Sequence, residues 1–68
     1  MYWREIRKSR HFENYHRGAL AWSDVVRLIH IIKNKRKKGN KIEIEDSRFY
    51  ILCELKCKIL YVINVKTK

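Results

Sequence analysis

The hydrophobic period changes half-way along this chain, and that change limits the folds that the chain can adopt. Between Ser23 and Asn34 the apolar residues recur at helical spacing. From Lys41 to Glu45 apolar and charged residues alternate, as they do in a strand with one buried face. A helix of this kind buries its apolar stripe by packing on a sheet, so the sequence predicts an α+β domain.

The helical pattern predicts an amphipathic helix over residues 23–34. Ser23 is the expected N-cap, and Lys33 and Lys35 suit the negative end of the helix dipole. Arg27 and Lys33 should face solvent. Gly39 follows with a residue type that tolerates positive φ, and so closes the segment.

The second half predicts a three-stranded antiparallel meander. Its strands are residues 41–45, 49–55 and 59–65, joined by turns at Asp46-Ser47 and at Lys56-Cys57-Lys58. Residues of one parity in the last two strands should face the helix. They are Phe49, Ile51, Cys53 and Leu55, then Ile59, Tyr61, Ile63 and Val65.

The opening segment predicts an edge strand within residues 1–6 and a short helix that Ser9 caps and that runs through Tyr15, with Gly18 as its stop. The expected order is β-α-α-β-β-β, with one or two N-terminal helices packed on an antiparallel sheet. Residues 1–68 should form one domain, since a chain of 68 residues has room for one core. A homodimer or a protein partner would cover apolar area that so small a core leaves open.

The sequence also predicts where in the cell the protein is found and whether its cysteines are reduced. The first ten residues are too charged for a signal peptide, and no apolar run approaches the roughly 20 residues of a membrane helix. We therefore expect a cytoplasmic protein with no membrane contact. Two cysteines, Cys53 and Cys57, do not make a secreted disulfide framework and should be reduced thiols.

A run of basic residues, the basic junction, separates the helical pattern from the strand pattern. Residues 33–41 hold six Lys or Arg in nine positions, and the net charge is +9 over residues 1–41 but +1 over residues 42–68. A loop that presents so many like charges favours a polyanion, so nucleic acid is the predicted partner. The alternative is a solubilising lysine-rich loop. The predicted contact residues are Arg4, Arg7, Lys8, Arg10, Lys33, Lys35, Arg36, Lys37, Lys38 and Lys41.

Three short motifs resemble the small toxins of the RelE/ParE and BrnT-like superfamily. They are Ser9-Arg10-His11-Phe12, Arg17-Gly18 and Trp22-Ser23-Asp24-Val25-Val26, followed by the basic junction and the strands. The resemblance implies two helices against an antiparallel sheet. It also implies RNA as the favoured ligand, with metal-independent cleavage of messenger RNA or pairing with an acidic antitoxin as activities.

Cleavage of RNA without a metal needs a base, an acid and cations that stabilise the phosphorane. The resemblance aligns His11 and Arg17 with recurrent positions of the superfamily. Arg48 and Tyr50 are further candidates because they begin a strand beside the basic junction. Catalytic members often carry His or cationic residues on or after the last strand, and this chain departs from them by ending at Val65-Lys66-Thr67-Lys68. A non-catalytic nucleic-acid-binding module, on DNA or ribosomes, is therefore the second hypothesis.

Aromatic residues interleave with the N-terminal arginines, a mixture that stacks on bases and contacts phosphates. Phe12 and Trp22 are better explained as packing residues, whereas Tyr2 and Trp3 fit either role. We expect no cofactor. We also expect no metal site, since the spacing of the His and Cys residues fits no compact zinc pattern.

A third hypothesis is an interaction protein. Its basic face would meet an acidic peptide, such as an antitoxin segment, and an open sheet edge would accept an added strand.

Overall fold

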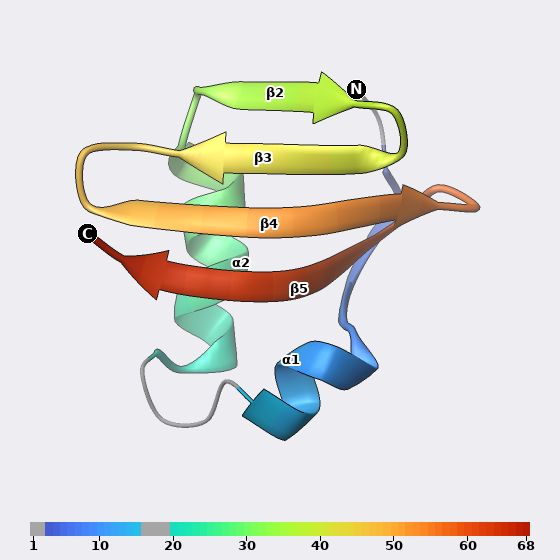
Figure 1. Ribbon diagram of the computed structural model, residues 1–68, viewed down its shortest axis with the longest axis horizontal. Coiled ribbons are helices and arrows are strands. Elements are labelled where there is room, and N and C mark those ends of the chain that lie inside the picture. Colours follow the sequence, from blue (N-terminus) through green and yellow to red (C-terminus); the bar gives the residue numbers. More distant parts are fainter. Residues whose placement is uncertain (1–2, 16–19) are drawn as a thin grey trace.

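The computed structural model describes residues 3–15 and 20–68 and shows an α+β fold with a five-stranded mixed sheet and two short helices (Figure 1). In chain order the elements are β1 (Glu5–Lys8), α1 (Arg10–Tyr15), α2 (Trp22–Ile31), β2 (Lys35–Lys38), β3 (Lys41–Glu45), β4 (Phe49–Lys56) and β5 (Ile59–Thr67). No helix in these residues is long and apolar enough to cross a lipid bilayer.

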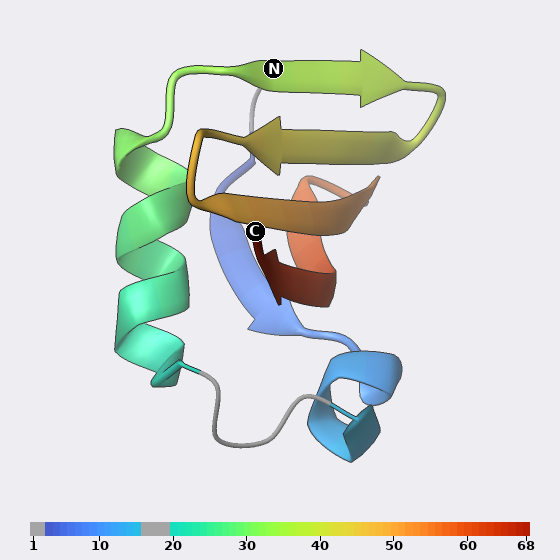
Figure 2. The same cartoon turned by 60° about the vertical axis from the view of Figure 1, so that its left-hand side comes forward.

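The sheet has the strand order β1-β5-β4-β3-β2. Neighbours from β5 to β2 run antiparallel, but β1 pairs with β5 in parallel, so the sheet is mixed and the prediction of a wholly antiparallel sheet was wrong. The helix α2 lies along one face of the sheet, here called the inner face, and α1 follows β1 at the edge opposite β2 (Figures 1 and 2). The other face, the outer face, carries the polar residues of the alternating strands.

The core lies between α2 and the inner face. Val25 and Ile29, one turn apart on α2, are fully buried, as are Ile42 and Ile44 of β3. The ring centroids of Phe12 and Trp22 are 5.6 Å apart, which confirms these two residues as packing residues. The remaining buried residues are Ile32, Ile51, Cys53, Leu60, Val62 and Val65.

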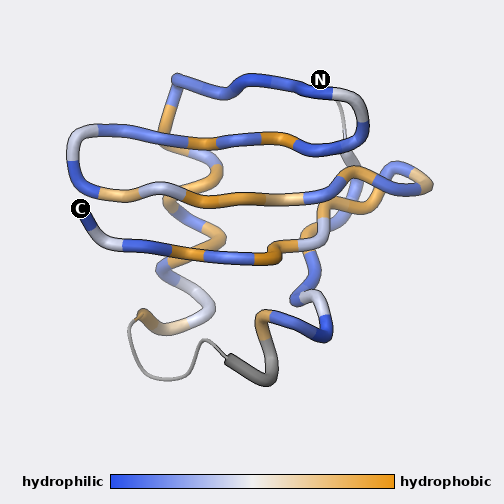
Figure 3. Tube along the Cα trace, in the orientation of Figure 1, coloured by the Kyte–Doolittle hydropathy of each residue, from blue (hydrophilic) through white to orange (hydrophobic). Residues whose placement is uncertain are grey.

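The basic junction contains a strand, so the prediction of a loop was wrong. Lys35–Lys38 pairs antiparallel with β3 as the edge strand β2, and Figure 3 shows it hydrophilic along its length. A two-residue turn joins β2 to β3, in which Gly39 has a φ of 61°. Strand propensity and alternation are absent from Lys-Arg-Lys-Lys. The strand forms because its backbone pairs with β3. Its charged side chains are of the kind that discourages a further strand from pairing with an open edge.

The inward face of β5 was also predicted wrongly in part. Val65 is buried as expected, but Leu60 and Val62 are buried in place of their neighbours. The register explains the switch: Leu52 pairs with Asn64 and Cys53 pairs with Val62, so one extra residue bulges out of β5. A bulge shifts the alternation by one residue. It therefore leaves Ile59, Tyr61 and Ile63 partly exposed.

Helix ends differ slightly from the predictions. Helix α2 begins one residue before Ser23, with Ala21 as an N-cap that makes no side-chain hydrogen bond, and it ends at Ile31 because Ile32 is extended. The capping prediction for α1 is confirmed, since Ser9 Oγ accepts a hydrogen bond from the Phe12 amide at 3.1 Å. The expected stop at Gly18 lies outside the described residues.

Candidate nucleic-acid interface

Cations from three separate segments meet at one end of the sheet. The register places the β2–β3 turn, the β4–β5 turn and the start of β1 at the same end (Figure 1). Hydrogen bonds join the segments: the Leu55 amide donates to the Asn40 carbonyl at 2.7 Å, and the Arg4 amide donates to the Lys58 carbonyl at 2.9 Å. We call the cations of this end the turn rim. They are Arg4, Lys38, Lys41, Lys56 and Lys58.

The β4–β5 turn has an uncommon conformation for its sequence. Lys56 pairs with Ile59, so two residues form the loop, and Cys57 and Lys58 have φ values of 53° and 62°. Two-residue hairpins favour this left-handed conformation, but asparagine and glycine normally occupy it. The chain thus keeps a lysine at the tip of a hairpin where a glycine would fit with less strain.

Two carboxylates reach the turn rim without neutralising it. Lys38 Nζ lies 3.4 Å from Glu43 Oε1, and Lys41 Nζ lies 3.6 Å from Glu54 Oε2. The Lys38 side chain is 72 % exposed and that of Lys41 is 44 % exposed, and ion pairs open to solvent are worth about 0–1 kcal/mol. A phosphate can therefore compete for both lysines.

The basic junction is divided by the fold, because alternate residues of β2 point to opposite faces. On the outer face Arg36 lies 2.8 Å from a carboxylate oxygen of Glu45 and 3.6 Å from one of Glu43, so its charge is balanced. Toward the inner face Lys35 donates to the Ile32 carbonyl. Lys37 is exposed and pairs with no carboxylate in the described part of the chain. Lys33, after α2, faces solvent as predicted, and so does Arg27 on the helix.

Of the predicted N-terminal contact residues, some have partners within the protein and others are available to a ligand. Arg7 forms an ion pair with Glu5, and the Lys8 ammonium lies 5.4 Å from the centroid of the Trp22 ring. Arg10 is exposed and lines a hollow of about 320 Å³ together with Lys56. Arg10 therefore extends the turn rim toward α1.

The catalytic candidates do not converge on one site. His11 is exposed on α1, two residues after Ser9, whose amide donates to the Val62 carbonyl. Tyr50 pairs with Lys66, which lies four residues, or about 13 Å, beyond Val62 along β5. Arg17 lies outside the described residues.

Arg48 and Tyr50 also have different surroundings. Arg48 lines a hollow against α2 with Asp24 and Phe49, on the inner side of the sheet. On the outer face Tyr50 Oη donates to Glu43 Oε2 at 2.7 Å, and this bond, with partial burial, raises the pKa of Tyr50 to about 12. Tyr50 therefore keeps its proton at neutral pH and serves as a donor to Glu43.

Neither cysteine extends the site. Cys53 is a small residue of the core, and its burial raises the pKa of its thiol to about 12. Cys57 is exposed in the β4–β5 turn. Within residues 3–15 and 20–68, no three His, Cys, Asp or Glu side chains form a group that could hold a metal ion.

The sequence reasoning missed two cations of the turn rim, Lys56 and Lys58. Their turn was recognised, but strand register decides which turns share one end of a sheet. The only local signal was that one lysine directly precedes the two-residue turn and another lies within it.

In comparisons with protein-family models, curated proteins and solved structures, nothing matches this chain. The resemblance to the RelE/ParE and BrnT-like toxins therefore rests on the short motifs in the sequence. The activities that it implies stay predictions.

The carboxylates of the outer face and the β3–β4 turn should make stability depend on pH. Hydrogen bonds from Tyr50 lower the pKa of Glu43, those from Lys68 and Arg36 lower that of Glu45, and backbone amides lower that of Asp46. A lowered pKa adds stability that is present above the ordinary value, 4.5 for Glu, and is lost as pH falls through the lowered value.

We therefore expect the free energy of unfolding in urea to fall as pH decreases below about 4.5. Glu45→Gln should be less stable than the wild type at pH 7 and should lose less on acidification. An unfolding midpoint that stays constant from pH 5 to pH 3 in the wild type would contradict this assignment.

Proposed function

We propose that this protein binds nucleic acid through the turn rim, with single-stranded RNA as the expected ligand. The observation that carries the proposal is the meeting of Arg4, Lys38 and Lys56, one from each of three segments, at one end of the sheet. Lysine and arginine that neutralise phosphates supply most of the affinity of non-specific nucleic-acid binding. A net charge of +10 adds long-range attraction.

The shape of the turn rim supports a strand as the ligand. From β1 to β2 the rim crosses four strand spacings, or about 19 Å, which is wide enough to follow several phosphates. Arg10, at the start of α1, continues the cationic surface from Lys56 through the hollow that they share. RNA is favoured by the sequence resemblance alone, so the test includes DNA.

Binding without cleavage is the form of the proposal that the geometry supports. His11, Arg48 and Tyr50 lie on α1, on the inner side and on the outer face, so they belong to three different surfaces rather than to one cluster.

Binding to RNA, single-stranded DNA and duplex DNA, measured in chelator over a range of salt, tests the proposal. Five rim contacts predict a slope of about −3.5 for the logarithm of affinity against the logarithm of salt on a single strand. RNA should be recovered intact. Absent binding at low salt, or a slope near zero, would refute the proposal. Cleavage that His11→Ala abolishes would establish the endoribonuclease hypothesis instead.

A second candidate function, capture of an acidic peptide, rests on the position of β2. In the described part of the chain β2 pairs only with β3, so its other edge is open and basic. An acidic strand could add to this edge through backbone hydrogen bonds. Such a strand would slow hydrogen exchange of the outward-facing amides along the whole of β2, whereas a nucleic acid on the turn rim would act on β2 only at its Lys38 end.

A further inference from the structure

A hollow next to the turn rim has the composition of a site for a flat aromatic ring. It has a volume of about 280 Å³, lies between β1 and α2, and is here called the Trp3 pocket. Its lining residues are Trp3, Arg4, Glu5, Ile6, Val26 and His30. Small-molecule sites begin at about 300 Å³, so the pocket suits one small ring system.

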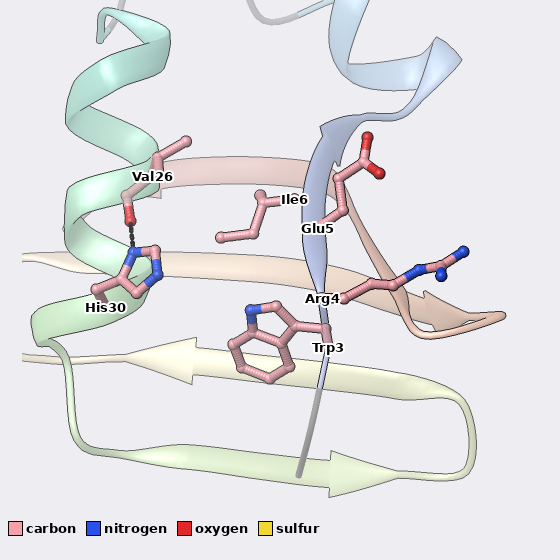
Figure 4. A pocket seen from close by; sticks show the side chains of 6 residues that line it. All are labelled: Trp3, Arg4, Glu5, Ile6, Val26 and His30. Atoms are coloured by element: carbon pink, nitrogen blue, oxygen red, sulfur yellow. Dashed lines mark hydrogen bonds between the residues drawn. The ribbon is translucent and has the colours of Figure 1, made fainter.

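The apolar wall of the Trp3 pocket comes from both sides. Figure 4 shows Trp3 and Ile6 extending from the β1 segment toward α2, with Val26 and His30 on the helix opposite them. Trp3 and Ile6 are half-buried and pack on the core, which fixes the indole while leaving part of it exposed. A fixed and partly exposed indole can stack on another ring without losing much conformational entropy.

His30 adds a polar group with a defined proton. Its Nδ1 lies 2.9 Å from the Val26 carbonyl oxygen, which can only accept, so Nδ1 carries the hydrogen. In the neutral ring Nε2 is then an acceptor. Figure 4 shows this side of the imidazole turned toward Trp3. A ring that rests on Trp3 and carries an N–H group therefore meets an acceptor in the pocket.

The Trp3 pocket is continuous with the turn rim through Arg4. The side chain of Arg4 points away from Trp3 in Figure 4, and its amide is anchored to the Lys58 carbonyl. Because Arg4 belongs to the rim and also lines the pocket, a strand whose phosphates contact Arg4 lies next to the pocket. Its occupant should be a ring attached to a phosphate chain.

We propose that the Trp3 pocket holds one unpaired base of a nucleic-acid strand whose phosphates lie on the turn rim, with the base stacked on the indole of Trp3. This inference rests on the proposed function and adds its mode of recognition. Stacking on an aromatic side chain accepts any base, because every base has a π face. A duplex keeps its bases stacked inside, so the pocket favours single strands.

The experiment compares two probes of about 12 nucleotides, an oligouridylate and the same phosphate chain without bases. The wild-type protein should bind the oligouridylate about tenfold or more tightly than the abasic chain. Trp3→Leu should lower affinity for the oligouridylate by a similar factor and leave affinity for the abasic chain unchanged.

Fluorescence gives a second readout, because the chain has two tryptophans. In Trp22→Phe the emission of Trp3 should be quenched by the oligouridylate and unaffected by the abasic chain. In Trp3→Leu, where Trp22 is the reporter, saturating oligouridylate should change the emission little.

The outcomes separate the two proposals. Equal affinity of the wild type for both probes would overturn the Trp3 pocket and leave the turn rim standing. Failure of the wild type to bind either probe at low salt would overturn both. The comparison of probes on the wild type needs no substitution, so it can overturn the Trp3 pocket even where a tryptophan variant fails to fold.

Discussion

Replacing Ile29 by alanine should lower the free energy of unfolding by about 2–5 kcal/mol. Ile29 is fully buried in the middle of α2, where it faces the sheet, and its truncation leaves a cavity that surrounding strands cannot close. A domain of this length has roughly 3–10 kcal/mol of stability in total. Ile29→Ala should therefore unfold at least about 10 °C below the wild type in circular dichroism melts.

The matched control lies two residues away on the same helix. Ile31 is 61 % exposed, so Ile31→Ala removes the same atoms from solvent rather than from the core. It should change the free energy of unfolding by less than about 0.5 kcal/mol. If the two variants melt together, α2 does not pack on the sheet through the face that contains Ile29.

Elements with strong local patterns were predictable from the sequence. The apolar residues of α2 repeat at helical spacing, and alternation along β3 and β4 places Ile42, Ile44, Ile51 and Cys53 in the core. In each case the burial of one face produces a hydrophobic period in the sequence. This period can be recognised without knowing which other elements pack against the helix or strand. The short helix after Ser9 was predictable because its cap is local.

Features that depend on pairing were not predictable. The strand β2 has no apolar residue, and only the partner β3 makes it a strand. The bulge in β5 interrupts alternation without any glycine to mark it, so counting by two from Ile59 gave the wrong face for every residue before Val65. Parallel pairing of β1 with β5 joins the two ends of the chain, and such contacts leave no short-range signal.

The candidate site shows the same division. Basic character and the N-terminal Arg4 could be read from composition, but the glutamates that balance Arg36 sit seven and nine residues farther along the chain. Strand register brings them together on the outer face. It also brings Lys56 beside the β2–β3 turn. Charge counting therefore predicted a polyanion as ligand and included Arg4, Lys38 and Lys41 of the turn rim, but it could not show that strand register adds Lys56 and Lys58 to them.

Combining Arg4→Gln, Lys38→Gln and Lys56→Gln should weaken binding to single-stranded RNA about 100-fold at 0.1 M salt. Each residue comes from a different segment of the turn rim, and each lost phosphate contact lowers the salt slope by about 0.7. Three lost contacts thus lower the logarithm of affinity at 0.1 M salt by about 2. Titrations at several salt concentrations measure both quantities.

The control removes the same charge elsewhere. Arg27, Lys33 and Lys66 are exposed and lie on α2, after it and near the far end of β5, away from the turn rim. Changing all three to Gln should lower affinity only a few-fold, through the weaker long-range attraction of a less cationic molecule. Equal losses in the two triple variants would mean that net charge, rather than the meeting of three segments at one end of the sheet, holds the nucleic acid. If both variants also keep the wild-type circular dichroism spectrum, this result would refute the turn rim as the interface.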